Sequence, residues 1–129
     1  MLREKLREVI KRNASLVDLE DGILKLLTDL DEKGPVAILV AGSVAKGEFV
    51  RGMSDIDILI VVNSSSFKTW ITAIGDVNVE ITEIGIRDVL EALRAGNNFI
   101  EKALKDGVVL KGEEHVERLK QMIQQRALQ

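Results

Sequence analysis

Two apolar runs on either side of a polar loop constrain the fold of this chain more than any other feature. They span residues 36–41 and 56–62 and consist of Ala, Val, Leu and Ile, apart from one Asp at position 57. Short runs that are apolar on both faces are typical of β-strands covered on both sides of a sheet. The loop between them is rich in Gly, Ser and charged residues. We therefore expect the chemistry of the protein to lie where these two strands meet the loop.

A pair of carboxylates opens the second run. Asp55 and Asp57 are two residues apart, and because side chains alternate along a strand, both point to the same face of the sheet. Two carboxylates on one face suit a divalent cation. The chain has no Cys and one His, so oxygen ligands are favoured and the expected ion is Mg²⁺ or Mn²⁺.

Length and charge limit the classes of protein to be considered. At 129 residues with 46% hydrophobic residues, the chain is expected to form one domain with its own core. The net charge of −3 disfavours extended binding to nucleic acid, which depends on a surplus of Lys and Arg. No run approaches the roughly 20 apolar residues of a membrane span, and the charged N-terminus does not resemble a signal peptide. We expect a cytoplasmic protein without membrane association.

The order of predicted elements indicates an α/β (α+β) fold, a small mixed β-sheet flanked by helices. Hydrophobic spacing and turn residues predict helices at 1–12, 18–33, 67–73, 86–95, 98–105 and 113–127, and strands at 36–41, 56–62, 76–84 and 108–110. The single domain of residues 1–129 would have its core at about 36–84, with helical flanks at 1–33 and 86–127.

A third acid stands on a later strand. In the stretch 76–84, apolar and polar residues alternate, and Glu80 lies on the polar face. Glu83, the rival acid, falls on the opposite face. Glu80 is therefore the residue expected to complete a metal shell or to take a proton from an attacking hydroxyl.

Two common phosphate-binding motifs are disfavoured. Gly42 and Gly47 have the spacing of the glycines in a P-loop, but Glu48 and Phe49 follow where Lys and Ser or Thr are needed. The dinucleotide fingerprint fails as well, because Val44 stands where it needs Gly.

What remains is a Gly-Ser pair at the end of one strand. Gly42 would let a phosphate approach the backbone, and Ser43 can donate its hydroxyl and main-chain N–H to phosphate oxygens. Gly42 leaves the end of the first strand and Asp55 begins the second, so both reach one cleft most simply if strands 36–41 and 56–62 are antiparallel and Glu80 faces the same way. Nucleotidyl transfer needs little more than such a phosphate site and bound metal ions.

These residues resemble a known signature. Gly42-Ser43, followed after eleven residues by Asp55-Ile56-Asp57, resembles that of the polymerase-beta-like nucleotidyltransferase superfamily. The stretch 42–60 is similar to its small stand-alone branch, the minimal nucleotidyltransferases of archaea and bacteria. The resemblance implies a nucleotidyltransferase fold that binds Mg²⁺ and ATP or another nucleoside triphosphate.

The resemblance also implies roles by position. Gly42 and Ser43 would hold the triphosphate, and Asp55 and Asp57 the metal ions. The triplet 79–81 matches the third family carboxylate, but Glu80 stands where Asp is usual and is one methylene longer.

The other candidate nucleotide-binding residues lie in the loop. Lys46 stands where the family often has Arg and would contact a phosphate without a planar fork. Arg51 is a further candidate, and Ser54 directly precedes the aspartate pair. For both Lys46 and Arg51, a solvated loop position is the open alternative.

Three functions follow as hypotheses. The first is an enzyme that moves a nucleoside monophosphate, AMP from ATP, to a hydroxyl of a protein or small molecule. The second is a binding module. In the small branch such proteins resemble antitoxins, each paired with a helical toxin that is a ribonuclease, and the antitoxin silences the toxin by binding it or by adding AMP to it. The third is a nucleotide-sensing subunit. A chain of 129 residues has little room for a substrate domain, so a partner protein or a second copy is expected to complete the cleft.

Overall fold

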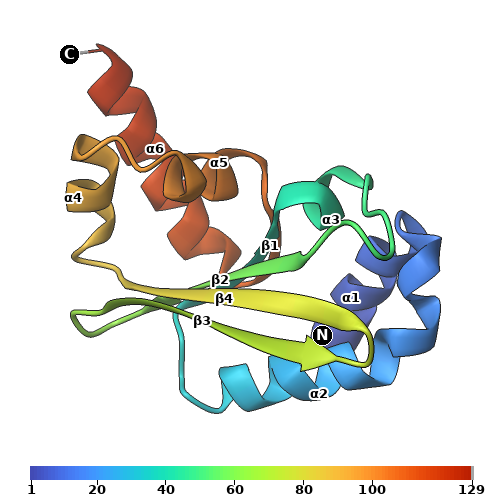
Figure 1. The fold of residues 1–129 in the computed structure, drawn as a ribbon. Helices are drawn as coiled ribbons and strands as arrows, with labels where there is room; N and C mark the ends of the chain where they lie inside the picture. Colours follow the sequence, from blue (N-terminus) through green and yellow to red (C-terminus); the bar gives the residue numbers. More distant parts are fainter. Residues whose placement is uncertain (129) are drawn as a thin grey trace.

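The computed structural model describes residues 1–128 and has a five-stranded mixed β-sheet with helices on both faces (Figure 1). The strand order is β3-β4-β2-β1-β5, which confirms the predicted α+β class. The elements are α1 (Leu2–Lys11), η1 (Ala14–Leu19), α2 (Glu20–Asp31), β1 (Ala37–Ala41), α3 (Gly42–Lys46), β2 (Ile56–Val62), β3 (Phe67–Ile74), β4 (Val77–Gly85), α4 (Val89–Arg94), α5 (Asn98–Asp106), β5 (Val108–Lys111) and α6 (Glu113–Leu128).

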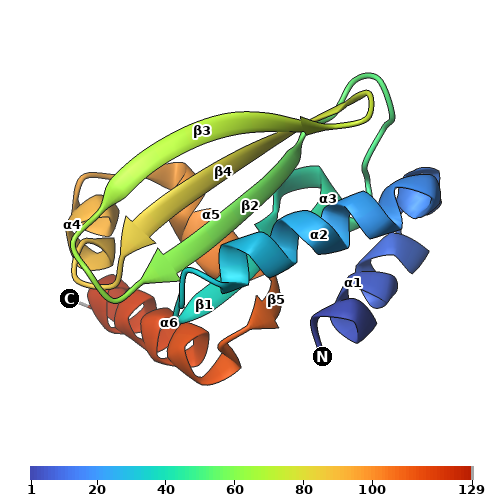
Figure 2. The ribbon, with the colours of Figure 1, turned by 90° about the horizontal axis from the view of Figure 1, so that it is seen from below.

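The sheet separates two apolar layers. On one face α1 and α2 cover one set of strand side chains, and on the other face α4, α5 and α6 cover the alternate set (Figures 1 and 2). The central strands β1 and β2 are buried almost throughout, as their apolar composition predicts. Both ends of the polar loop are therefore anchored in rigid strands.

The strand directions agree with the prediction that one cleft collects the polar residues. β1 and β2 are antiparallel, with Ala41 opposite Asp57. β2 and β4 are parallel, with Asp57 opposite Glu80. The two acids thus stand on adjacent strands and face the same way.

The prediction of a helix at residues 67–73 is wrong, because this segment is strand β3 (Phe67–Ile74). β3 pairs with β4 through a two-residue turn at Gly75-Asp76, with Gly75 at φ 58°. Such a turn needs a positive φ and is typical of a β-hairpin. The β-branched residues of the segment and the pairing with β4 favour a strand over a short helix.

Two further differences concern where helices begin. Residues 18–33 were predicted as one helix, but a 3₁₀ segment, η1, runs to Leu19 before α2 begins at Glu20. The Gly-Ser pair, expected in an open loop, begins the short helix α3. No described helix is long and apolar enough to cross a membrane.

Candidate active site

The close packing of two strands places Gly42 against an aspartate. Because Ala41 pairs with Asp57, the next residue along the chain lies beside that carboxylate. A Cβ built on Gly42 would overlap Asp57 Oδ2 and lie 3.4 Å from its Cγ. Gly42 also has φ +61°, a conformation that L side chains rarely adopt. Glycine is thus required here by both the backbone and the neighbouring acid.

Three carboxylates form an acidic group next to this glycine. Asp57 is half-buried, whereas Asp55 and Glu80 are exposed. Burial, and then the negative charges of Glu80 and Asp55, raise the pKa of Asp57 to about 6. Among the side chains of residues 1–125, which the structure describes, none makes a hydrogen bond or salt bridge to these three carboxylates.

The acidic group fits a divalent cation in donor type and charge. Carboxylate oxygens are the ligands that Mg²⁺ and Mn²⁺ prefer, and a cation would relieve the repulsion that raises the pKa of Asp57. Among the described residues, no three acidic or histidine side chains are gathered closely enough to form a complete metal site. The residues therefore fit a cation in donor type and charge, with Asp55, Asp57 and Glu80 as the available ligands, and not as a complete metal site.

Ser43 lies in the first turn of α3, directly after Gly42. α3 ends at Lys46 and is capped by Gly47, whose φ of 71° is left-handed, and the Ser43 carbonyl accepts a hydrogen bond from Glu48 N–H at 2.9 Å. In the part of the chain that the structure describes, the Ser43 hydroxyl has no hydrogen-bond partner. It is available to a ligand beside Asp57.

Lys46 borders a cavity of about 110 Å³ between α3 and α5. Its ammonium group makes no salt bridge to the described side chains of residues 1–125. The cavity is lined by Ala41, Gly42, Ala45, Lys46, Phe99, Lys102, Ala103, Asp106 and Gly107.

Three polar or aromatic residues of this cavity were not singled out from the sequence. Phe99, Lys102 and Asp106 are three and four residues apart on α5, a spacing that places them on one helix face. That periodicity was visible in the sequence, but nothing in it indicated that this face adjoins Gly42.

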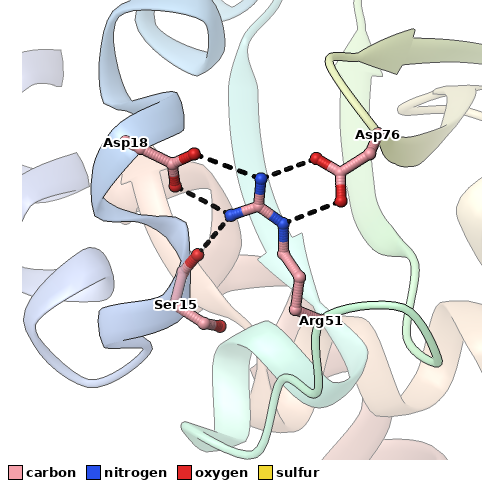
Figure 3. Close-up of polar contacts among 4 residues, drawn as sticks. All are labelled: Ser15, Asp18, Arg51 and Asp76. Carbon is pink, nitrogen blue, oxygen red and sulfur yellow. Dashed lines mark hydrogen bonds and ion pairs between the residues drawn. The ribbon is translucent and has the colours of Figure 1, made fainter.

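Arg51 binds other carboxylates than those of Asp55, Asp57 and Glu80. Its guanidinium makes five hydrogen bonds, to both carboxylate oxygens of Asp18, both of Asp76 and the main-chain oxygen of Ser15, at 2.6 to 3.1 Å (Figure 3). An arginine has five N–H donors, so all are engaged. The hydrogen bonds from Arg51 hold the pKa of Asp18 and that of Asp76 below their usual range.

Ser54 closes a turn immediately before the aspartate pair. Its Oγ accepts a hydrogen bond from Val50 N–H at 3.1 Å, and its own N–H donates to Val50 O at 2.8 Å. The structure thus places Ser54 as a support for the start of β2.

The sheet face next to Glu80 is open. Ile71 on β3 lies opposite Glu80 on β4 and is 69% exposed, and Phe67 on the same face is 53% exposed. An apolar, uncovered surface therefore extends away from the carboxylates toward the edge of the sheet.

The predicted site residues fall into two groups. Gly42, Ser43, Asp57 and Glu80 come together at one end of the sheet, with Asp55 just before β2. Lys46 lies at the end of α3, and the loop residues Arg51 and Ser54 bond within the protein.

Comparison with known protein families gives a match over most of the chain. The model of the nucleotidyltransferase domain family matches residues 23–127. No curated protein matches the chain. The matched region contains β1, α3, β2 and β4, and therefore every element of the carboxylate and Gly-Ser site. The chain belongs to the nucleotidyltransferase domain family.

Proposed function

We propose that the protein transfers a nucleoside monophosphate, AMP from ATP, to a hydroxyl group of a protein or small-molecule acceptor. One observation carries the proposal: Asp57 and Glu80 are partners on adjacent strands, and Gly42 packs against Asp57. Family membership supports nucleotidyl transfer in general, and the acidic group adds the chemistry that such a reaction needs.

The reaction would join the acceptor oxygen to the α-phosphorus of ATP. The bond from that phosphorus to the bridging oxygen of the β-phosphate breaks, and pyrophosphate leaves. Gly42 and Ser43 would hold the phosphates, and Glu80 would accept the hydroxyl proton. Asp55 and Asp57 would hold Mg²⁺ or Mn²⁺, which when bound supplies positive charge to the phosphate oxygens.

The acceptor would approach over the open face of β3 and β4. Ile71 lies opposite Glu80 and is exposed, so an acceptor with an apolar surface can place a hydroxyl beside the carboxylates. Lys46, at the end of α3 next to the 110 Å³ cavity, would contact a phosphate oxygen.

The proposal is tested by the position of a radioactive label. ATP labelled at the α-phosphate should transfer its label to an acceptor with Mg²⁺ present, whereas ATP labelled at the γ-phosphate should not. Asp57→Asn should abolish the transfer, and Glu32→Gln, which removes an exposed carboxylate at the end of α2, should leave it unchanged. Transfer of the γ-label, or equal transfer by Asp57→Asn and the wild type, would contradict the proposal.

The second candidate is a binding module without catalysis, which neutralises a helical ribonuclease toxin or senses nucleotide. It is favoured by the absence, among the described side chains of residues 1–125, of three side chains gathered as a complete metal site, and by Glu80 in place of the usual Asp. Retention of a co-purifying partner by the Asp55→Ala, Asp57→Ala double variant, with no label transfer by the wild type, would favour this function over the first.

A further inference from the structure

A short N-terminal segment holds the loop that joins the Gly-Ser pair to the aspartates. We call residues 42–55 the active-site loop. Asn13, between α1 and η1, donates from Nδ2 to Val44 O at 2.9 Å, and its Oδ1 accepts from Phe49 N–H at 3.1 Å. One side chain therefore binds the loop at α3 and again just beyond it.

The contacts of Asn13 require an amide at this position. Asn13 is 5% exposed, and its Nδ2 donates a second hydrogen bond to Val9 O at 2.9 Å. A polar side chain buried to this extent is costly unless its groups are paired. A carboxylate lacks the donor that bonds to Val44 O. An apolar side chain leaves Phe49 N–H without a partner and leaves Val44 O with only the hydrogen bond from Gly47 N–H at 3.2 Å.

Arg51 fixes the second half of the loop. Asp18 and Ser15 O bind its guanidinium on one side and Asp76 on the other (Figure 3). Paired N–H donors on a carboxylate fix both distance and orientation. Asp76 directly precedes β4, so Arg51 connects the N-terminal segment, the active-site loop and the strand that carries Glu80.

The holding residues of the N-terminal segment come from outside the region that the family model matches, whereas Arg51 and Asp76 lie inside it. That region begins at residue 23, whereas Asn13, Ser15 and Asp18 precede it. The groups they hold lie between Ser43 and Asp55, so the N-terminal segment determines how the phosphate site is placed relative to the carboxylates.

We propose that Asn13, Asp18 and Arg51 are positioning residues, which hold the active-site loop in the conformation that binds ATP and transfers its nucleotide. The inference rests on the proposed function. It assigns to Arg51 a role through the loop in place of a direct phosphate contact.

The test compares loop mobility, nucleotide affinity and turnover in matched variants. Asn13→Asp removes the amide donor, and Asp18→Asn and Arg51→Lys each weaken the guanidinium contacts. The control is Arg7→Gln, because Arg7 pairs with Glu20 at 3.4 Å in the same N-terminal region without touching the loop.

Hydrogen–deuterium exchange gives a readout that does not depend on catalysis. In the three positioning variants, amides of residues 42–55 should exchange at least about tenfold faster, while those of β5 exchange as in the wild type. Asp76→Asn provides a further variant should Arg51→Lys fail to fold. Loop exchange at the rate of the wild type and of Arg7→Gln would overturn the proposal.

Calorimetry with a non-hydrolysable ATP analogue and Mg²⁺ links loop mobility to function. The positioning variants should bind the analogue about 10- to 100-fold more weakly, with kcat/KM reduced at least as much and KM for ATP raised. A mobile loop with wild-type affinity and turnover would overturn the proposal. Wild-type protein that binds the analogue but transfers no label would refute only the proposed transfer, whereas wild-type protein that binds no analogue would refute both.

Discussion

The carboxylate of Asp57 occupies the space that a side chain at position 42 would need, because a Cβ on Gly42 would overlap Asp57 Oδ2. Gly42→Ala should therefore displace Asp57 in addition to straining the backbone at φ +61°. We expect a stability loss of about 1–2 kcal/mol from the backbone alone and a fall in label transfer of roughly 100-fold or more. Chemical denaturation and the α-label assay measure the two effects.

Gly34 provides the matched control. It has φ +71°, and nothing lies within 4 Å of a Cβ built there. Gly34→Ala should thus lose about 1–2 kcal/mol of stability and keep its label transfer. If both variants lost transfer equally, displacement of Asp57 would not be the cause.

The pKa of Asp57 predicts how the stability of the metal-free protein depends on pH. Burial, Glu80 and Asp55 raise the pKa of Asp57 to about 6, so the folded state binds this proton more tightly than the unfolded state does. The contribution of this bound proton to the free energy of unfolding is complete below about pH 4 and is lost as pH rises through 6. The full shift corresponds to about 3 kcal/mol, which solvent screening of a half-exposed group reduces to about 1–2 kcal/mol.

Asp57→Asn should remove this dependence. Relative to the wild type, the unfolding free energy of the variant should rise by about 1–2 kcal/mol between pH 4 and pH 8, as measured by urea titration at each pH. Glu32→Gln should show no such change between pH 5.5 and pH 8, and a flat difference for Asp57→Asn would contradict the prediction.

Addition of Mg²⁺ should offset the loss of stability that ionisation of Asp57 causes at high pH. A cation that binds the ionised carboxylates stabilises the folded state, so Mg²⁺ should raise the Tm of the wild type at pH 8. At pH 4.5 protons compete for Asp57 and the effect should be small. Thermal scans of the wild type and Asp57→Asn with and without Mg²⁺ check this, and an equal rise in Tm in both proteins would place the ion elsewhere.

Glu80 is expected to be needed for transfer and for the raised pKa of Asp57. Glu80→Gln removes the charge opposite Asp57 and should lower label transfer by about 10²- to 10⁴-fold while it lowers the pKa of Asp57. Glu80→Asp, which restores the residue usual in the family, should keep transfer within about tenfold of the wild type. Asn78→Ala, two residues earlier on the same exposed face, is the control, and wild-type transfer by Glu80→Gln would exclude the role.

The central strands and the facing of the acids could be predicted from the sequence because they depend on local alternation. The prediction of how the acids face needed only the two-residue period of a strand, applied to Asp55, Asp57 and Glu80. The antiparallel pairing of β1 and β2 follows from the requirement that Gly42 reach the same cleft. The structure agrees for Asp57, Glu80 and the pairing of β1 with β2, whereas Asp55 lies just before β2.

Strand β3 and the hold on the active-site loop could not be predicted in the same way. Residues 67–73 are short enough to suit either helix or strand, and pairing with β4 decides between them. The partners of Arg51 lie 25 to 36 residues away in sequence, and Asn13 lies 36 residues from Phe49. Contacts at such separations leave no periodic signal, so the sequence left Arg51 as a candidate for either a phosphate contact or a solvated loop position.

Asn13 should contribute more to stability than an ordinary capping asparagine. Asn13→Ala would leave Phe49 N–H without its partner in a buried site, and Val44 O would keep only its hydrogen bond from Gly47 N–H at 3.2 Å. An unpaired buried group costs about 1–3 kcal/mol, so with the lost bond to Val44 O we expect a loss of about 2–3 kcal/mol. Asn97→Ala is the comparison, because the Asn97 side chain accepts one hydrogen bond, from Ile100 N–H at 3.0 Å, at the start of α5. Its loss should be about 1 kcal/mol. Urea titrations of both variants measure the difference, and equal losses would mean that water replaces Asn13 between the two loop groups.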